Sequence, residues 1–88
     1  MTGLQWAVLQ AYARTLPLGI ERFRLRSLTY AQRPARMGVA LVQAAALGYL
    51  KNGHLTLSGM RAAWVYLDVM ARDMERAARE RSRTGQRE

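Results

Sequence analysis

Arginine is the residue type whose number and spacing in this 88-residue chain point most clearly to a chemical function. Six arginines and one glutamate fall between residues 14 and 36, so this stretch carries +5 of the chain's net charge of +8. Guanidinium groups match the geometry of phosphate oxygens, and dense positive charge attracts a polyanion. Phe23 and Tyr30 lie within the stretch and carry rings on which bases can stack. We therefore predict a nucleic-acid-binding surface formed by Arg22, Arg24, Arg26, Arg33, Arg36 and, further along the chain, Arg61.

Two other interpretations of the same stretch stay open. Thirteen arginines against one lysine are also what a G+C-rich genome encodes, so the arginines fit the solvated face of an ordinary helix as well. The segment from residue 18 to residue 30 mixes large apolar side chains with arginines, as a membrane-surface helix does. We favour membrane binding least, because Arg22, Arg24 and Arg26 fall on too many sides of a helix to leave a separate apolar face.

The side chains that carry out catalysis are scarce. The chain has one histidine, no cysteine and six carboxylates. Five carboxylates follow residue 67, each within four residues of an arginine, and pairs such as Asp68–Arg72 and Glu75–Arg79 indicate surface ion pairs. His54 has no second ligand at a metal-binding spacing, and there is no glycine-rich phosphate-binding loop. We therefore expect a protein that is not an enzyme and has neither metal nor cofactor.

The apolar residues, which make up half of the chain, suggest a second function. The chain has two Trp, four Tyr and five Met, which are residue types enriched at protein interfaces. The alternative to a regulator that binds nucleic acid is therefore a small inhibitor or adaptor, of the kind that phages and plasmids encode, that docks on a larger host or regulatory protein. Its contact residues are expected on the last helix at Trp64, Tyr66, Val69 and Met70. We also favour a homodimer, because a long helix with apolar residues on several sides often pairs with another.

Four helices are predicted to position these residues. They are expected from about Leu4 to Leu16, Ile20 to Arg33, Pro34 to Lys51 and Ser58 to Arg83. Thr2 and Gln5 have the spacing of a capping box, and Asn52-Gly53 is typical of a helix stop. The fold class is all-α: a small four-helix domain with a buried central helix, assigned to the apolar run 37–50, and a long amphipathic C-terminal helix. The apolar seam of that last helix is expected to consist of Met60, Trp64, Leu67, Ala71, Met74 and Ala78.

Two segments allow a second structural interpretation. Residues 23–26 alternate between apolar and basic side chains, as a half-buried strand would. We prefer a helix there, because the chain offers no second strand to pair with it. Residues 44–64, with Gly53 between two helices, have the outline of a helix-turn-helix, although the break over 52–57 is longer than the usual turn of about 3–4 residues.

Length and composition predict one domain over residues 1–81 and a flexible basic tail over residues 82–88. A chain without cysteine forms no disulfide, which fits a reducing compartment. The longest apolar run has fourteen residues, fewer than the ~20 that a membrane span needs, and the N-terminus carries no basic leader. We therefore expect a cytoplasmic protein with no membrane span.

Overall fold

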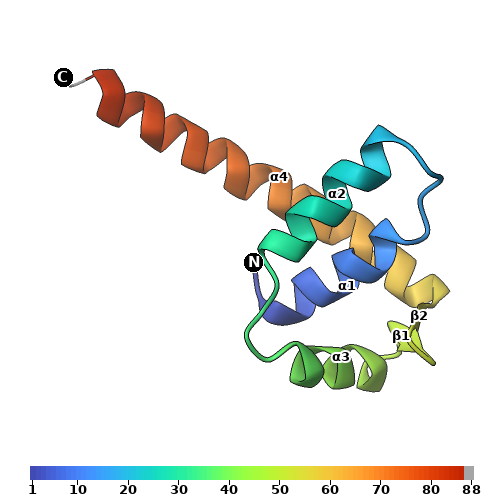
Figure 1. Cartoon of the computed structure of the whole chain (residues 1–88). Coiled ribbons are helices and arrows are strands. Elements are labelled where there is room, and N and C mark those ends of the chain that lie inside the picture. The colour runs from blue at the N-terminus through green and yellow to red at the C-terminus, as the bar shows by residue number, and fades with distance from the viewer. Residues whose placement is uncertain (87–88) are drawn as a thin grey trace.

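The structure, a computed structural model, describes residues 1–86 and the side chains of residues 1–82. Four helices and one very short hairpin follow one another along the chain (Figure 1), and the all-α prediction is confirmed. The elements are α1 (Gly3–Ala13), α2 (Ile20–Ala31), α3 (Met37–Ala46), β1 (Leu50–Lys51), β2 (His54–Leu55) and α4 (Leu57–Gln86).

The buried central helix is α1, around which α2, α3 and the first half of α4 are packed (Figure 1). Its buried side chains, spread around the helix, are Ala7, Val8, Leu9, Ala11 and Ala13. The assignment of the central position to residues 37–50 was therefore wrong. The physical reason is that α1 has no charged residue and is apolar on all sides, which suits a helix with neighbours on several sides. The predicted capping box of Thr2 and Gln5 begins this helix.

Helix α3 is buried on one side only. Ala40 and Ala44 face α1, and their small side chains allow the two helices to approach closely. The helix ends at Ala46, and Gly48 adopts a φ of 80° in the turn that follows. On the other side of α3, Val39 and Val42 are exposed by 53% and 69%.

A two-stranded hairpin replaces the last turn of the expected third helix. Asn52 and Gly53 have φ values of 54° and 79°, the conformation of a type I′ turn, and they bring Leu50 opposite Leu55. The prediction that these two residues stop a helix was wrong, as was the statement that the chain offers no pair of strands. The helix-turn-helix outline over residues 44–64 is also wrong, because a hairpin separates the two helices. An Asn-Gly pair is common both at helix ends and in hairpin turns. The apolar residues on either side of it pack against the core, and this packing favours the hairpin.

Helix α4 begins at a side-chain cap formed by Thr56. The Thr56 hydroxyl accepts a hydrogen bond from the Gly59 N–H at 3.0 Å and donates one to the Gly48 carbonyl. Gly59 and Ala63 are buried on the core side of α4, which brings the first turns of the helix close to the hairpin. The expected seam is therefore rotated: Trp64, predicted in the core, is 53% exposed. Small residues are needed where the backbones approach closely, so the large indole points outward.

The second half of α4 extends away from the other elements and gives the molecule dimensions of 51 × 28 × 21 Å (Figure 1). The helix continues to Gln86, so no helix end marks the expected domain boundary at residue 81, and residues 87 and 88 of the expected tail lie outside the described residues. None of the helices in the described part of the chain is long and apolar enough to cross a membrane.

Candidate nucleic-acid interface

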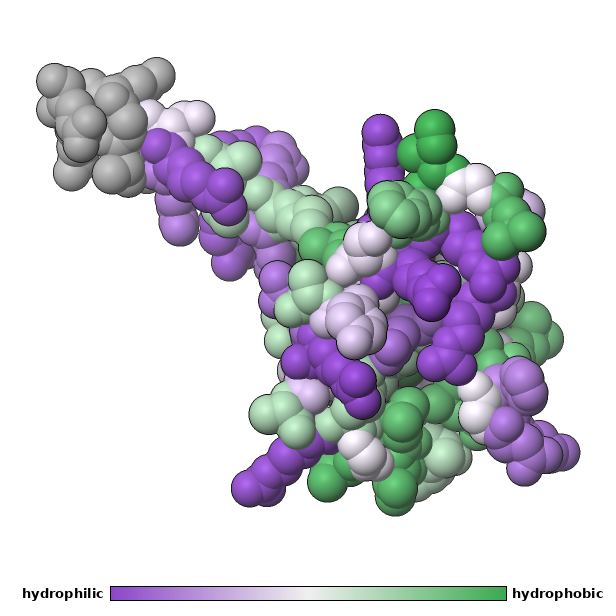
Figure 2. Space-filling view, in the orientation of Figure 1, coloured by the Kyte–Doolittle hydropathy of each residue, from purple (hydrophilic) through white to green (hydrophobic). Residues whose placement is uncertain are grey.

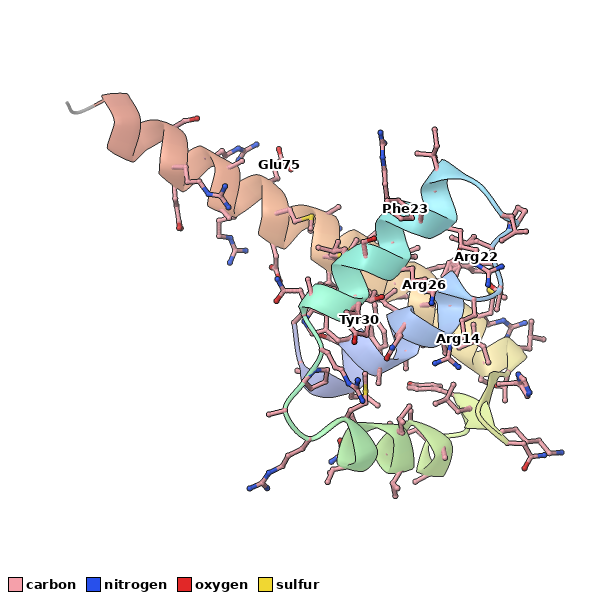
Figure 3. The ribbon with its side chains drawn as sticks, viewed as in Figure 1. Arg14, Arg22, Phe23, Arg26, Tyr30 and Glu75 are labelled. Carbon is pink, nitrogen blue, oxygen red and sulfur yellow. The ribbon has the colours of Figure 1, made fainter. Side chains whose placement is uncertain are left out.

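Helix α2 exposes two aromatic rings on one face. Leu25, Leu28 and Thr29 turn toward the rest of the molecule, which confirms a helix rather than a strand over this segment. On the outer side, Phe23 and Tyr30 are exposed by 70% and 66%. They are seven residues apart, which is close to two helical turns, so both rings point the same way (Figure 3).

Three arginines flank these rings. Arg22 and Arg26 are one turn apart on α2, and Arg26 lies between Phe23 and Tyr30 along the helix. Arg14 reaches the same side of the molecule from the end of α1 (Figure 3). The guanidinium of Arg22 donates to the Leu16 carbonyl at 3.3 Å and so joins α2 to the segment that follows α1. We call Arg14, Arg22, Phe23, Arg26 and Tyr30 together the α2 face.

The α2 face is strongly positive because no acid balances it. Among the described side chains, no carboxylate forms an ion pair with Arg14, Arg22 or Arg26. Glu21 is the one acid of α2, and it lies on the opposite flank of the helix, in the groove described below. Figure 2 shows the result as a hydrophilic area over α2 and the end of α1, with hydrophobic areas on either side of it.

The other four predicted arginines are dispersed. Arg33 is exposed and follows the end of α2, where its backbone N–H donates to the Tyr30 carbonyl at 3.2 Å. Arg24 points to the other flank of α2, while Arg36 is the residue before α3 and Arg61 is exposed on α4. Arg14 is absent from the predicted set of arginines, but the structure places it on the α2 face (Figure 3). Its position directly after an uncharged helix, at the negative end of the helix dipole, was the available signal.

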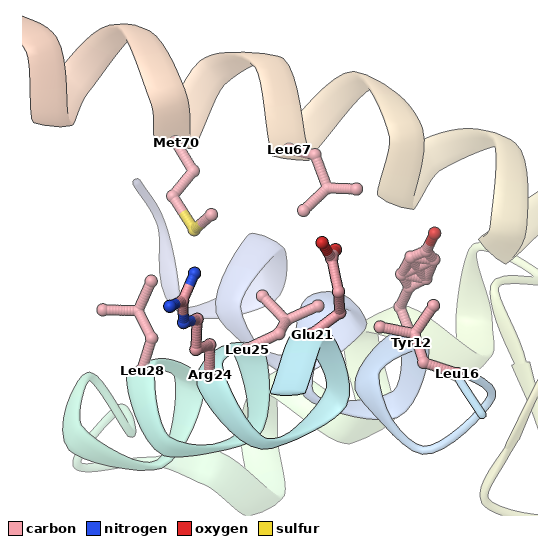
Figure 4. A pocket seen from close by; sticks show the side chains of 8 residues that line it. All are labelled: Tyr12, Leu16, Glu21, Arg24, Leu25, Leu28, Leu67 and Met70. Carbon is pink, nitrogen blue, oxygen red and sulfur yellow. The ribbon is translucent and has the colours of Figure 1, made fainter. Parts of the chain in front are cut away.

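A groove of about 310 Å³ separates α2 from α4. Leu67 and Met70 project from α4 toward Leu25 and Leu28 of α2, and Tyr12 and Leu16 lie at one end (Figure 4). Glu21 and Arg24 are its two charged residues. The groove is therefore mainly apolar and offers one carboxylate and one guanidinium to whatever enters it.

The fold places the predicted protein-contact residues of α4 in different environments. Trp64 is exposed, beside Val65 at 60% exposure, with Leu57 at 68% two turns earlier. Val69 is half-buried, and Met70 lines the groove. Tyr66 packs against the core with Tyr49, and its burial, followed by a hydrogen bond to Tyr49, raises the pKa of its phenol above the usual value.

Residues 1–86 contain no group of three or more His, Asp or Glu side chains arranged to hold a metal ion. Comparison with models of protein families, with curated proteins and with solved structures gave no match for this chain.

Proposed function

We propose that this chain is a non-catalytic regulatory protein that binds nucleic acid through the α2 face. One observation carries the proposal: arginines that form no ion pair with any described carboxylate lie on the same side of the molecule as two exposed aromatic rings. Arginines bind phosphates and exposed rings stack on bases, so the surface offers both kinds of contact at once. We place this function in the cytoplasm, because the chain has no cysteine.

The composition of the α2 face favours phosphate contacts over the reading of a base sequence. Reading base edges requires hydrogen-bonding side chains that enter a groove of the duplex. Of the side chains that read base edges, the α2 face has arginine, which also binds phosphate, and it lacks the Asn, Gln, Asp and Glu that read adenine and cytosine. The proposed protein therefore contacts the nucleic-acid backbone, with little preference for sequence.

The salt dependence of binding tests the proposal. Arg14→Gln with Arg26→Gln removes two exposed charges of the α2 face, and we expect weaker binding to every sequence. In a plot of log affinity against log salt, the slope should fall in magnitude by about 1.4–1.8, because each lost phosphate contact removes about 0.7 for single strands and 0.9 for duplexes. Fluorescence anisotropy with a labelled oligonucleotide measures both quantities.

The matched control is Arg72→Gln with Arg76→Gln, which removes the same charge from the exposed surface of α4. Its salt slope should stay within about 0.3 of the wild-type value if the contacts are localised. Equal losses in the two double variants would show a response to net charge alone and would contradict a site on α2.

A second candidate function is the docking of a protein on α4, and the exposed Trp64 with its apolar neighbours favours it. Trp64→Ala should leave folding intact, since more than half of this side chain is in solvent. A discrete protein captured from nuclease-treated lysate by the wild type and by the Arg14/Arg26 variant, but lost with Trp64→Ala, would establish this function. Capture that disappears with nuclease would contradict it.

A further inference from the structure

We infer that the α2 face accepts single-stranded nucleic acid, with unpaired bases stacked on Phe23 and Tyr30. The inference rests on the proposed function and names its substrate class. Two aromatic rings at 70% and 66% exposure contribute little to the core. Their position between the arginines of the same surface suits contact with bases.

The spacing of the rings fits a strand laid along α2. Seven residues of α-helix advance by about 10.5 Å. Successive bases in a stacked strand are about 3.4 Å apart, so Phe23 and Tyr30 lie roughly three base steps from one another. Arg26 lies between the two rings along the helix, and we expect it to contact the phosphates that connect the stacked bases.

A duplex fits this surface less well. Its bases are already paired and stacked, so exposed rings at the centre of the contact would meet the phosphate backbone instead of a base. Extruding one base from a duplex costs the free energy of unpairing and unstacking it, and a single strand does not require this step. Base–ring stacking accepts any base, which agrees with a surface that has little preference for sequence.

The discriminating experiment measures the affinity of 12-nucleotide oligo(dT), 12-nucleotide oligo(U) and a 12-base-pair duplex. Each is measured with the wild type and with a double variant that carries Phe23→Leu and Tyr30→Leu. Leucine keeps an apolar side chain but removes the ring. We expect the double variant to lose about 30-fold or more in affinity for the single strands, and less than about threefold for the duplex. Its salt slope should not change, because the arginines remain. Tyr30→Phe, which keeps the ring, should bind as the wild type does.

Phe23 also supplies a direct probe, because it is the one phenylalanine of the chain. Its ring signals in NMR spectra of the full-length protein should shift when oligo(dT) or oligo(U) is added, and should shift far less with the duplex. Binding of either single strand supports the inference, and a difference between them would show that the 2′-hydroxyl is sensed.

Equal affinity for duplex and single strand, together with no effect of the leucine variant, would overturn the inference. The proposed function would survive that result if the Arg14/Arg26 variant still lost affinity. Absence of binding to all three oligonucleotides at low salt would instead remove the proposed function and the inference with it.

Discussion

Tyr66 and Trp64 show how the fold distributes two neighbouring aromatic residues. Sequence periodicity places Trp64 in the seam and Tyr66 on the surface, and the structure reverses the two. The reversal follows from Gly59 and Ala63, which occupy the tightest part of the contact and set the rotation of α4. A hydropathy pattern ranks residues by polarity and is insensitive to this need for small side chains. As a consequence, Trp64 is the better surface probe, and Tyr66 is a partly buried residue that packs against the core.

Gly59→Ala should destabilise the protein strongly. A Cβ at this position would overlap the Tyr49 carbonyl oxygen and come within 2.7 Å of Leu55 Cδ1, so the hairpin and α4 would have to separate. We expect a loss of about 3 kcal/mol in the free energy of unfolding, measured by urea denaturation. The control is Gly38→Ala in α3, where no atom lies within 4 Å and alanine should be neutral or gain up to about 1 kcal/mol. Equal stabilities of the two variants would contradict the close contact.

Tyr66 should make stability fall at alkaline pH. Its pKa is raised in the folded protein by burial and by Tyr49, so the folded state holds the phenolic proton more tightly than the unfolded chain does. This contribution is complete below the unfolded value of about 10 and is lost as the pH rises through the folded pKa. Tyr66→Phe should therefore show a shallower loss of stability above about pH 10 than the wild type. Parallel alkaline unfolding curves for the two proteins would argue against a buried phenol.

Local signals in the sequence predict the ends of several elements well. The capping box at Thr2 and a helix that begins at Ile20 are confirmed, although this helix ends at Ala31 and not at Arg33. The failures lie where one local pattern serves two structures. The Asn52-Gly53 pair suits both a helix stop and a hairpin turn, and the packing of Leu50 and Leu55 decides between them. Such packing depends on α1, which is distant in sequence, so local patterns do not contain it.

Thr56→Ala should loosen the junction between the hairpin and α4. The hydroxyl caps α4 through Gly59 and also binds the Gly48 carbonyl, so alanine removes two hydrogen bonds. The expected cost is about 1–2 kcal/mol in the free energy of unfolding. Thr56→Ser keeps the hydroxyl and should recover most of the loss in the same denaturation experiment. If serine is as damaging as alanine, the hydroxyl is not the stabilising group.

For the molecule as a whole, the sequence predicts that positive charge is concentrated between residues 14 and 36. It does not predict which of these arginines share a surface. Arg22 and Arg26 lie together, whereas Arg24 and Arg36 point elsewhere, and Arg14 arrives from a different helix. Which arginines meet is set by how α1 and α2 cross, and this crossing angle is not encoded in residue spacing. The long reach of α4 beyond the domain is likewise a tertiary property, because nothing in its own pattern fixes where its neighbours stop.

Homodimerisation stays a prediction, and we expect its interface on the second half of α4. Most side chains from residue 74 to residue 82 are exposed, because this part of α4 extends away from the other elements (Figure 1). Pairing of this segment with a second copy would stabilise it. Sedimentation equilibrium should then give twice the chain mass of 10.0 kDa, and Met74→Arg should return a monomer. A mass of 10.0 kDa at every concentration would contradict the dimer.

The most direct test of the central claim is an NMR titration of the ¹⁵N-labelled full-length protein with the oligonucleotide that binds most tightly. If nucleic acid binds the α2 face, the largest changes in amide chemical shift should fall at residue 14 and across residues 22–33, while the amides around Trp64 stay unchanged. Shifts centred on α3, the hairpin or Trp64, or no shifts under conditions of saturating ligand, would contradict it.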